Sequence, residues 1–441
     1  MGDDKNRGGS LKMTGKRKRG SILVLGLALF AMFFGAGNLI FPPYLGFKAG
    51  EVWEVGFLAF VIVDVGMACV AVFAMSKGDG TIFSVTGLIG HKMGSLINTV
   101  IVVCIGPFLA IPRTAATTYE MAVNPLFPEL SGGEFIFYLL FFLVVFLLTV
   151  RKSAVVDIVG KILTPLMVVV LAYLIIRGIL SPLGEIQEKM NLAQAAQEGI
   201  VAGYQTMDTL AALVFAIIII SSAAQKGYTG KKEKNRAMIA SCAVAGVLLA
   251  LVYGGLSYLG ATVCDLYGED ITQAQLLIQI IRAILGDGGM ILLGMVVGLA
   301  CLTTAIGLVS SSSAYFEDLL GGRVPYKVIV TVITVGSFAI ANFGLSTIIS
   351  IASPVLSLLY PVVVTLIVCA LFGEKMRKTY IPQGASCAAL LISFCMVLES
   401  FGISFEILHF LPLYEMGLAW ILPAFLGGFV GFCIPKAKST V

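Results

Sequence analysis

Histidine and charged residues are scarce in this chain. Its 441 residues include only two histidines, His91 and His409, and 12% are Asp, Glu, Lys or Arg. Neither histidine stands in a metal-ligand spacing such as H-E-x-x-H, and the sequence has no phosphate-binding P-loop and no G-x-S-x-G nucleophile motif. These absences argue against a metalloenzyme, a serine hydrolase and an ATP-driven pump. We therefore expect no enzyme and no bound cofactor.

The nine cysteines form no recognisable framework either. No C-x-x-C occurs, and nearly all of the cysteines fall inside hydrophobic stretches. We expect small packing residues rather than disulfide partners or metal ligands. Their positions are 69, 104, 242, 264, 301, 369, 387, 395 and 433.

Long apolar stretches make up most of the sequence. Hydrophobic residues account for 58% of the chain and the mean hydropathy is +0.99, which is too apolar for a soluble domain. A helix needs about 20 mostly apolar residues to cross a bilayer. Scanning with that length predicts an all-α polytopic membrane protein with about twelve transmembrane helices. The predicted spans are 21–44, 53–76, 94–121, 135–150, 154–177, 200–225, 237–263, 288–316, 326–342, 345–371, 380–399 and 412–434.

Lysine and arginine are unevenly distributed around these spans. Most of the 29 basic residues fall in the N-terminal tail and in the even-numbered connections. Those on the predicted outer side are Lys48, Arg177, Lys189 and Arg282. Because cytoplasmic segments retain the basic excess, the tail 1–19 and the C-terminus 436–441 are both expected in the cytoplasm. The net charge of +4 then reflects topology and not a nucleic-acid partner.

The first span is interrupted near its middle. Gly35-Ala-Gly-Asn38 follows an apolar run and leads into Leu-Ile-Phe-Pro-Pro43. In lipid, a helix can be broken only where the freed N–H and C=O groups meet protein, water, an ion or a substrate. The interruption therefore predicts the binding site of a transporter.

A second interruption opens the sixth span. Gly203-Tyr-Gln-Thr-Met-Asp-Thr-Leu210 places polar residues just before an apolar run. Five spans in 20–177 and five more in 200–372 would enter the membrane with opposite polarity, because five is an odd number of crossings. The two breaks then occupy corresponding positions of a five-plus-five inverted repeat. The remaining spans, in 379–435, would be peripheral.

Two motifs carry a family resemblance. FFGAGNLIFPP at 33–43 and GYQTMDTLAALVF at 203–215, together with the twelve-span layout, resemble the bacterial branched-chain amino acid carriers. The resemblance covers nearly the whole chain after the tail. It implies a plasma-membrane symporter of leucine, isoleucine and valine with a cation, and a fold similar to that of the leucine transporter.

The residues at the breaks suit an amino acid substrate. Gly35 and Gly37 let a ligand approach the backbone, and the N–H groups from Ala36 onward form a positive pole for a carboxylate. Acceptors for the ammonium are expected from Gly203, Gln205, Thr206 and Asp208, and Asn38 either caps the half-helix or ligates an ion. The candidates for an apolar pocket are Phe33, Phe34, Ile105, Phe108, Leu109 and Phe215.

The resemblance also implies a sodium site. In the leucine-transporter fold, carbonyls of the first span and hydroxyls of the eighth bind the ion, and the matching positions here are Ala31, Phe34, Ala300, Thr303 and Thr304. The alternative for the threonines is a hydrogen bond to their own helix. Ser310 to Ser313, lower in the same helix, are a competing source of hydroxyls for the ion. Sodium is thus the expected co-transported ion, and a proton is the alternative.

Ionisable residues inside spans are costly in lipid and are functional candidates by default. Asp64 and Arg113 lie at compatible depths in spans two and three, so an ion pair is one interpretation. A gating or proton role is the other. Proton-driven transport of another neutral solute, and a membrane sensor that binds an amino acid without moving it, stay as alternative functions. The expected partners are the amino acid and the lipid bilayer, with no obligate protein partner evident.

The charge distribution makes the topology testable. Green fluorescent protein fused to the C-terminus should fluoresce in bacteria, and alkaline phosphatase fused there should be inactive, because each folds only on one side of the membrane. Alkaline phosphatase inserted after Lys189 should be active. The reverse pattern would contradict the assignment of both termini to the cytoplasm.

Overall fold

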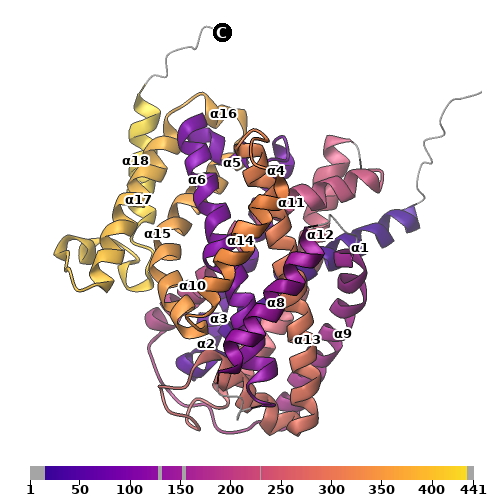
Figure 1. Cartoon of the computed structure of the whole chain (residues 1–441). Helices are drawn as coiled ribbons and strands as arrows, with labels where there is room; N and C mark the ends of the chain where they lie inside the picture. Colours follow the sequence, from indigo (N-terminus) through magenta and orange to yellow (C-terminus); the bar gives the residue numbers. More distant parts are fainter. Residues whose placement is uncertain (1–14, 128–131, 151–154, 229, 435–441) are drawn as a thin grey trace, which may run out of the picture.

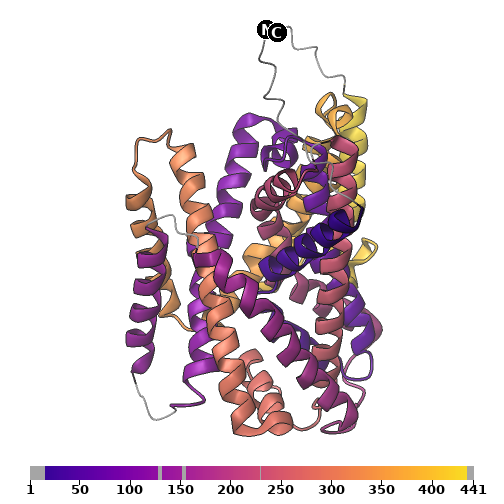
Figure 2. The ribbon, with the colours of Figure 1, turned by 90° about the vertical axis from the view of Figure 1, so that its right-hand side faces the viewer.

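The computed structural model describes residues 15–127, 132–150, 155–228 and 230–434. Within these residues every regular element is a helix, and the only β-type pairing is an isolated bridge between Gly50 and Glu188 (Figure 1). The all-α prediction is confirmed. Figure 2 shows many of the long helices running roughly vertically, as expected of a membrane bundle, with the indigo helix α1 strongly inclined to them.

The elements follow one another along the chain with short connections. Their bounds are α1 Gly15–Phe33, α2 Ala36–Ala49, α3 Trp53–Val61, η1 Ile62–Gly66, α4 Met67–Lys77, α5 Phe83–Thr86, η2 Gly87–Ile89, α6 His91–Val103, η3 Cys104–Phe108, α7 Ala110–Thr118, η4 Tyr119–Val123, α8 Gly133–Thr149, α9 Val155–Leu180, α10 Leu192–Thr206, α11 Asp208–Gln225, α12 Lys231–Ala261, α13 Gln273–Leu319, α14 Tyr326–Ala341, α15 Leu345–Leu371, α16 Glu374–Arg377, α17 Ile381–Ser400, η5 Glu406–Phe410, η6 Tyr414–Met416 and α18 Ile421–Cys433.

In the part of the chain that the structure describes, seven helical stretches are long and apolar enough to cross a membrane, and α1 with α2 forms an eighth, bent span. Four shorter apolar helices occupy the places of other predicted spans. They are Gly133–Thr149, Met167–Leu180, Tyr326–Ala341 and Ile421–Cys433. The prediction of a last span over 412–434 is wrong at its start, since residues 411–420 form turns around η6 and the helix begins only at Ile421.

The first break bends the chain sharply. The axes of Ser21–Phe33 and Ala36–Ala49 differ by 75°. Phe34 N–H still bonds the carbonyl of Phe30 at 2.8 Å, and Gly35 then takes an extended conformation. The half-helix α2 therefore starts with free N–H groups in the middle of the protein, where a helix N-terminus presents positive partial charge.

The second break depends on a single residue. α10 ends at Thr206, Met207 has a φ of 67°, and α11 begins at Asp208. A left-handed conformation costs a residue other than glycine about 1–3 kcal/mol, so the surrounding contacts must hold it. α10 starts at Leu192 rather than at residue 200, because Asn191 and Gln194 form a capping box there.

Further irregularities interrupt the second and third spans and the long helix α13. The second span contains a π-helical turn, η1, which carries Asp64, and the third span contains another, η3, which includes Pro107. In α13 the helix is kinked at Gly286, where φ is 66°. A π-turn inserts one residue and redirects the side chains around it, and such turns are frequent at functional sites.

Glycines allow α2 and α12 to pack backbone to backbone. A Cβ on Gly46 would lie 1.8 Å from the carbonyl oxygen of Ser257, and a Cβ on Gly260 would lie 1.8 Å from that of Pro43. Small residues of this kind let membrane helices approach closely. The contact holds the half-helix α2 against the long straight helix α12, and thereby fixes where the first break points.

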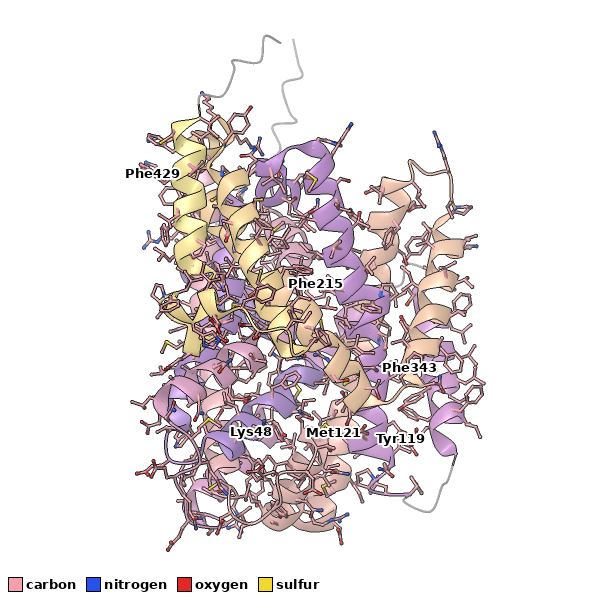
Figure 3. All side chains as sticks on the ribbon, turned by 90° about the vertical axis from the view of Figure 1, so that its left-hand side faces the viewer. Lys48, Tyr119, Met121, Phe215, Phe343 and Phe429 are labelled. Atoms are coloured by element: carbon pink, nitrogen blue, oxygen red, sulfur yellow. The ribbon has the colours of Figure 1, made fainter. Side chains whose placement is uncertain are left out.

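α17 and α18 pack against each other at one side of the bundle, and α17 also packs on α15 (Figure 3). α17 and α18 also meet through glycines, since a Cβ on Gly384 would lie 2.1 Å from the carbonyl oxygen of Gly427. Phe429 of α18 is 65% exposed and projects away from the protein. Exposed large apolar side chains of this kind are expected at a lipid-facing surface.

The α2–α12 contact makes Gly260 a sensitive position. Gly260→Ala should lower the thermal midpoint, because the new methyl group must displace the backbone at Pro43, at a cost of about 1–3 kcal/mol. Gly336→Ala in α14 is the matched control, since nothing lies within 4 Å of its added Cβ. Size-exclusion chromatography of heated, detergent-solubilised protein measures both. Equal midpoints would contradict the close approach of α2 and α12.

Candidate functional site

Asn38 joins the two breaks. Its Oδ1 accepts the N–H of Gly35 at 3.1 Å, and its Nδ2 donates to Asp208 Oδ2 at 2.8 Å and to Tyr253 Oη at 2.6 Å. One amide thus caps the half-helix α2, contacts the first residue of α11 and reaches α12. Asn38 is 1% exposed, so these bonds form away from bulk water. Of the two interpretations from sequence, the structure shows the capping contact.

Thr206 connects the second break to the second span. Its hydroxyl lies 2.6 Å from Asp64 Oδ1 and 2.7 Å from the carbonyl oxygen of Gly203, and its Oγ1 accepts the N–H of Asp208 at 3.4 Å. Asp64 is fully buried and Asp208 is 5% exposed. Thr206 therefore links the carboxyl group of Asp64 to the backbone at the start of α11.

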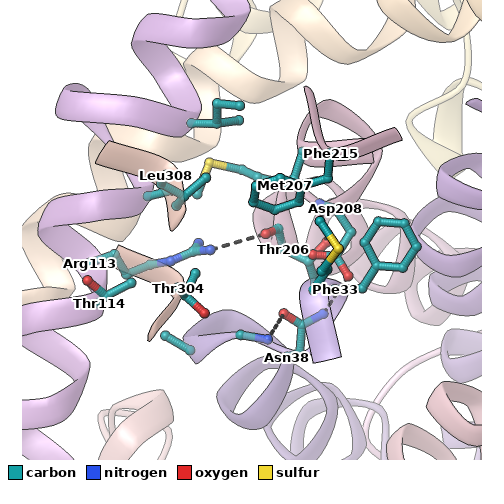
Figure 4. Close-up of a pocket in the computed structure, with 16 residues that line it drawn as sticks. Phe33, Asn38, Arg113, Thr114, Thr206, Met207, Asp208, Phe215, Thr304 and Leu308 are labelled. Carbon is teal, nitrogen blue, oxygen red and sulfur yellow. Dashed lines mark hydrogen bonds between the residues drawn. The ribbon is translucent and has the colours of Figure 1, made fainter. Parts of the chain in front are cut away.

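Arg113 of α7 binds the end of the half-helix α10. Its Nη1 donates to the carbonyl of Gln205, and its Nη2 donates to that of Thr206 at 3.2 Å (Figure 4). The last carbonyls of a helix have no partner within it and form a negative pole, which a guanidinium satisfies. The expected ion pair with Asp64 is not what the structure shows, because Arg113 donates to these carbonyls instead.

The guanidinium also depends on glycine in the first break. A Cβ on Gly37 would lie 2.9 Å from Arg113 Nη2, so a side chain there would displace the guanidinium. The Phe41 ring also lies 5.6 Å from Arg113 Cζ, a distance that permits a cation–π contact. Both helix breaks thus contribute to the position of one arginine.

Several buried polar atoms of this region have no hydrogen-bond partner among the described residues. They are Asp64 Oδ2, Arg113 Nε, Gln205 Oε1 and Tyr360 Oη. Buried polar atoms are nearly always paired, so a cluster of unpaired ones indicates that water, an ion or a ligand belongs there. The unpaired atoms include donors and acceptors, as an ion or a zwitterion would require.

A cavity lies against this network. It offers about 40 Å³ to the centres of water-sized spheres, enough for water in the conformation seen here. The wall contains one basic and one acidic side chain, those of Arg113 and Asp208 (Figure 4). The predicted substrate residues that line it are Phe33, Gly35, Ala36, Asn38, Ile105, Thr206, Asp208 and Phe215.

Other predicted residues lie elsewhere. Phe34 stacks on Phe30 with ring centroids 5.3 Å apart, and Phe108 is 37% exposed and absent from the cavity wall. Gly37, Leu109, Gly203 and Gln205 also lie outside the wall, although Gly37 and Gln205 contact Arg113.

Sequence reasoning missed further residues of the wall. They are Met32, Ala110, Thr114, Met207, Ala211 and Leu308. Leu308 follows Thr304 by one helical turn and could have been found by that spacing. Met207 lies between the polar residues Thr206 and Asp208. An apolar residue between polar ones at a helix break was the only sign in the sequence that it lines the cavity.

The candidate sodium ligands have different surroundings in the structure. Thr303 Oγ1 donates to the carbonyl of Ala300 at 2.9 Å, which is the bond to its own helix considered above as the alternative. Thr304 lines the cavity. Ala31 and Phe34 lie at the end of α1, and Ala300 and Thr303 lie in α13.

Two interrupted spans that meet at a buried, charged cavity define a membrane transporter of the leucine-transporter-like fold. Solved structures share that architecture. The inward-facing conformation of Mhp1 aligns over 93% of this chain and 90% of its own with a TM-score of 0.61 and 14% identity. A Na⁺-coupled sialic acid symporter aligns over 98% of this chain and 94% of its own, with a TM-score of 0.62 and 12% identity.

The sequence places the chain more narrowly. Residues 18–438 match the family described as branched-chain amino acid transport protein, and the chain belongs to that family. The branched-chain amino acid permease BrnQ of Bacillus subtilis is 36% identical over 96% of this chain and 98% of its own length. The carrier protein of branched-chain amino acid transport system 2 of Pseudomonas aeruginosa is 36% identical over 91% of this chain and 93% of its own. These relatives are permeases and carriers, not enzymes.

The hydrogen bonds of Asn38 lead to a testable difference. Asn38→Asp should lower the thermal midpoint strongly, because it places a carboxylate against Asp208 and removes the donor, and an unpaired buried charge costs about 3–5 kcal/mol. Tyr253→Phe removes one acceptor, leaves a buried N–H of Asn38 unpaired and should cost about 1–3 kcal/mol. Thermal unfolding of the purified variants measures both. Equal losses would contradict the bond from Asn38 to Asp208.

Proposed function

We propose that this protein imports leucine, isoleucine and valine across the bacterial plasma membrane by symport with a cation, through alternating access. The observation that carries the proposal is the buried cavity between two helix breaks, which has an arginine and an aspartate in its wall. Membership of the branched-chain amino acid transport family supports the substrate class.

The cavity wall suits a zwitterion with an apolar side chain. The substrate carboxylate would bind the free N–H groups at the start of α2 and the guanidinium of Arg113, and the ammonium would bind Asp208. Phe33, Phe215 and Ile105 would contact the side chain. Its burial is worth about 1.5–3 kcal/mol. An apolar pocket distinguishes one methylene by only about 1–3 kcal/mol, so overlapping recognition of the three amino acids is expected.

Charge balance supports coupling to one monovalent cation. Asp64, Asp208 and Arg113 carry a net charge of −1 when all are ionised, and a zwitterionic substrate adds none. Burying that excess charge is costly, so a cation should accompany the substrate. Sodium bound by Ala31, Phe34, Ala300, Thr303 and Thr304 is one form of the proposal. A proton shared between the two carboxyl groups is the other.

The proposal includes an arrangement of the spans and a motion between them. Twelve spans would form two inverted units, 20–177 and 200–372, with a peripheral pair in 379–435 and both termini in the cytoplasm. The broken spans would rock against a scaffold that contains the third and eighth spans. One sodium ion crossing about 100 mV supplies about 2.3 kcal/mol, and a tenfold sodium gradient adds about 1.4 kcal/mol. Together they sustain a leucine gradient of several hundredfold.

Uptake of labelled leucine into proteoliposomes tests the proposal. We expect uptake driven by an imposed sodium gradient and blocked by excess isoleucine or valine, with little effect of alanine. Uptake driven by a proton gradient would instead place coupling at the aspartates. Leucine binding without any uptake would contradict transport and favour a sensor.

Paired variants locate the coupling ion. Replacing Thr303 and Thr304 with valine keeps their shape and removes their hydroxyls, and it should lower the apparent sodium affinity at least tenfold if sodium binds there. Asp208→Asn removes a charge of the cavity wall and should reduce leucine uptake more than a hundredfold under either form of coupling. Unchanged sodium dependence in the double valine variant would exclude the hydroxyl site.

A further inference from the structure

A second and much larger cavity lies away from the central one. It offers about 660 Å³ to water-sized spheres and is bounded by α10, α15 and α17 and by the turn before α18. In α10 the lining residues run from Gln197 to Tyr204, and in α17 they run from Ser393 to the last residue, Ser400. By the predicted topology this is the outer half of the membrane. A cavity of this size is typical of a site for a drug-sized ligand.

The cavity lies on the side of α15 that is turned away from the protein core. Ser350, Pro354, Ser357 and Pro361 recur at helical spacing along its wall. The core-facing residues of the same helix, such as Leu356 and Tyr360, are fully buried on the other side. The cavity therefore belongs to the periphery of the bundle, between the broken span and the α17–α18 pair seen in Figure 3.

Uncharged polar groups line this cavity together with aromatic rings. None of the described residues that line it is Asp, Glu, Lys, Arg or His. The polar side chains are those of Gln197, Ser350, Ser353, Ser357, Ser393 and Ser400. A charged or zwitterionic ligand would find no counter-charge there, and burying an ion without one costs several kcal/mol. The wall thus excludes the substrate of the central site.

One of these hydroxyls, that of Ser393, has no hydrogen-bond partner among the described residues. Ser393 is 2% exposed and lines the cavity. Most serines inside membrane helices bond a carbonyl one turn earlier, as Ser386 does on the same helix with Pro382 at 2.6 Å. The Ser393 hydroxyl is instead available to a ligand.

We propose that this outer cavity binds a neutral membrane lipid whose head carries hydroxyl groups, such as a glycerol or a sugar. The acyl chain would fill the apolar part of the wall, along Ile351, Val355 and Met396. The hydroxylated head would bond the serines and Gln197. Phospholipids with a charged head are excluded by the absence of counter-charges in the wall.

An occupant would contact the moving part of the transporter. Tyr204 lines the cavity and stacks on Tyr360, with ring centroids 4.4 Å apart. Tyr204 stands just before Gln205 and Thr206, whose carbonyls bind Arg113. A bound lipid therefore restrains the half-helix α10 close to the second break, and this half-helix would move during alternating access.

The chain offers a spectroscopic probe at the site. It contains only two tryptophans, and Trp420 lines the cavity. Trp53→Phe leaves Trp420 as the single tryptophan. Trp53 packs on Phe57 and Tyr258, and none of these three residues lines the cavity. Bromine atoms on an acyl chain quench tryptophan fluorescence at contact, so they report occupancy.

The experiment titrates three dibrominated lipids into nanodiscs of phosphatidylethanolamine and phosphatidylglycerol that hold the Trp53→Phe protein. A monoacylglycerol and an alkyl glucoside test the two kinds of hydroxylated head, and brominated lysophosphatidylglycerol carries the same single acyl chain as the monoacylglycerol on a charged head. We expect saturable quenching by at least one neutral lipid, competed by its unbrominated form, and only gradual, unsaturable quenching by the charged lipid. The same gradual quenching by all three would overturn the proposal.

Variants of the wall complete the test. Ser357→Phe should fill the cavity and abolish the saturable phase, whereas Ser346→Phe, at an exposed position of α15 outside the wall, should leave it unchanged. Ser393→Ala removes the unpaired hydroxyl without adding bulk and should weaken binding several-fold, so it serves if Ser357→Phe does not fold. Saturable quenching that survives both Ser357→Phe and Ser393→Ala would place the lipid elsewhere and refute the site.

Discussion

The hydrogen bonds of Asn38 are the interaction on which the rest of the site depends. A helix that stops in the middle of a membrane leaves N–H and C=O groups with no partner, and lipid supplies none. Asn38 satisfies one such N–H at Gly35 and at the same time donates to Asp208, the first residue after the second break. Each break is therefore stabilised partly by the other, although the two are far apart in the sequence.

The remaining members of the network follow from that contact. Arg113 takes the carbonyls that the end of α10 exposes, Thr206 turns its hydroxyl toward Asp64, and Gly37 leaves room for the guanidinium. The π-turn at η1 carries Asp64 to this point of the second span. Together these groups fill the gap between two half-helices, yet they leave several buried polar atoms unpaired. Buried polar atoms are nearly always paired, so a ligand bound at these atoms would complete the network.

The central and the outer cavity differ in the charge of their walls and in their position in the bundle. The central one has a cation and an anion in its wall and lies at the breaks, whereas the outer one has hydroxyls, an amide and rings and lies at the periphery. They are linked by the short segment of α10 that runs from Tyr204 to Thr206. Any event in the outer cavity that shifts this segment is transmitted to Arg113, because the arginine bonds its last carbonyls.

Much of the fold was predictable because the bilayer imposes a length and a polarity on each span. The break at Gly35-Ala-Gly-Asn38 was visible for the same reason, since glycine and asparagine in an apolar run have few structural explanations. The start of α18 was not predictable, because Leu413, Leu418 and Trp420 continue the apolar pattern while forming turns. Hydropathy reports whether a residue tolerates lipid and does not report whether the chain there is helical.

The sequence by itself determined the class of protein, the all-helical architecture, the two breaks and most of the residues that line the central cavity. Tertiary structure alone decided the partners: that Arg113 binds the carbonyls of α10 and not Asp64, that Phe108 faces outward, and that Thr303 bonds its own helix. The physical reason is that a span's composition depends on the surrounding solvent, which acts on each segment separately. Hydrogen-bond partners depend instead on the distances between segments remote in the chain, and those distances are set only when the helices pack.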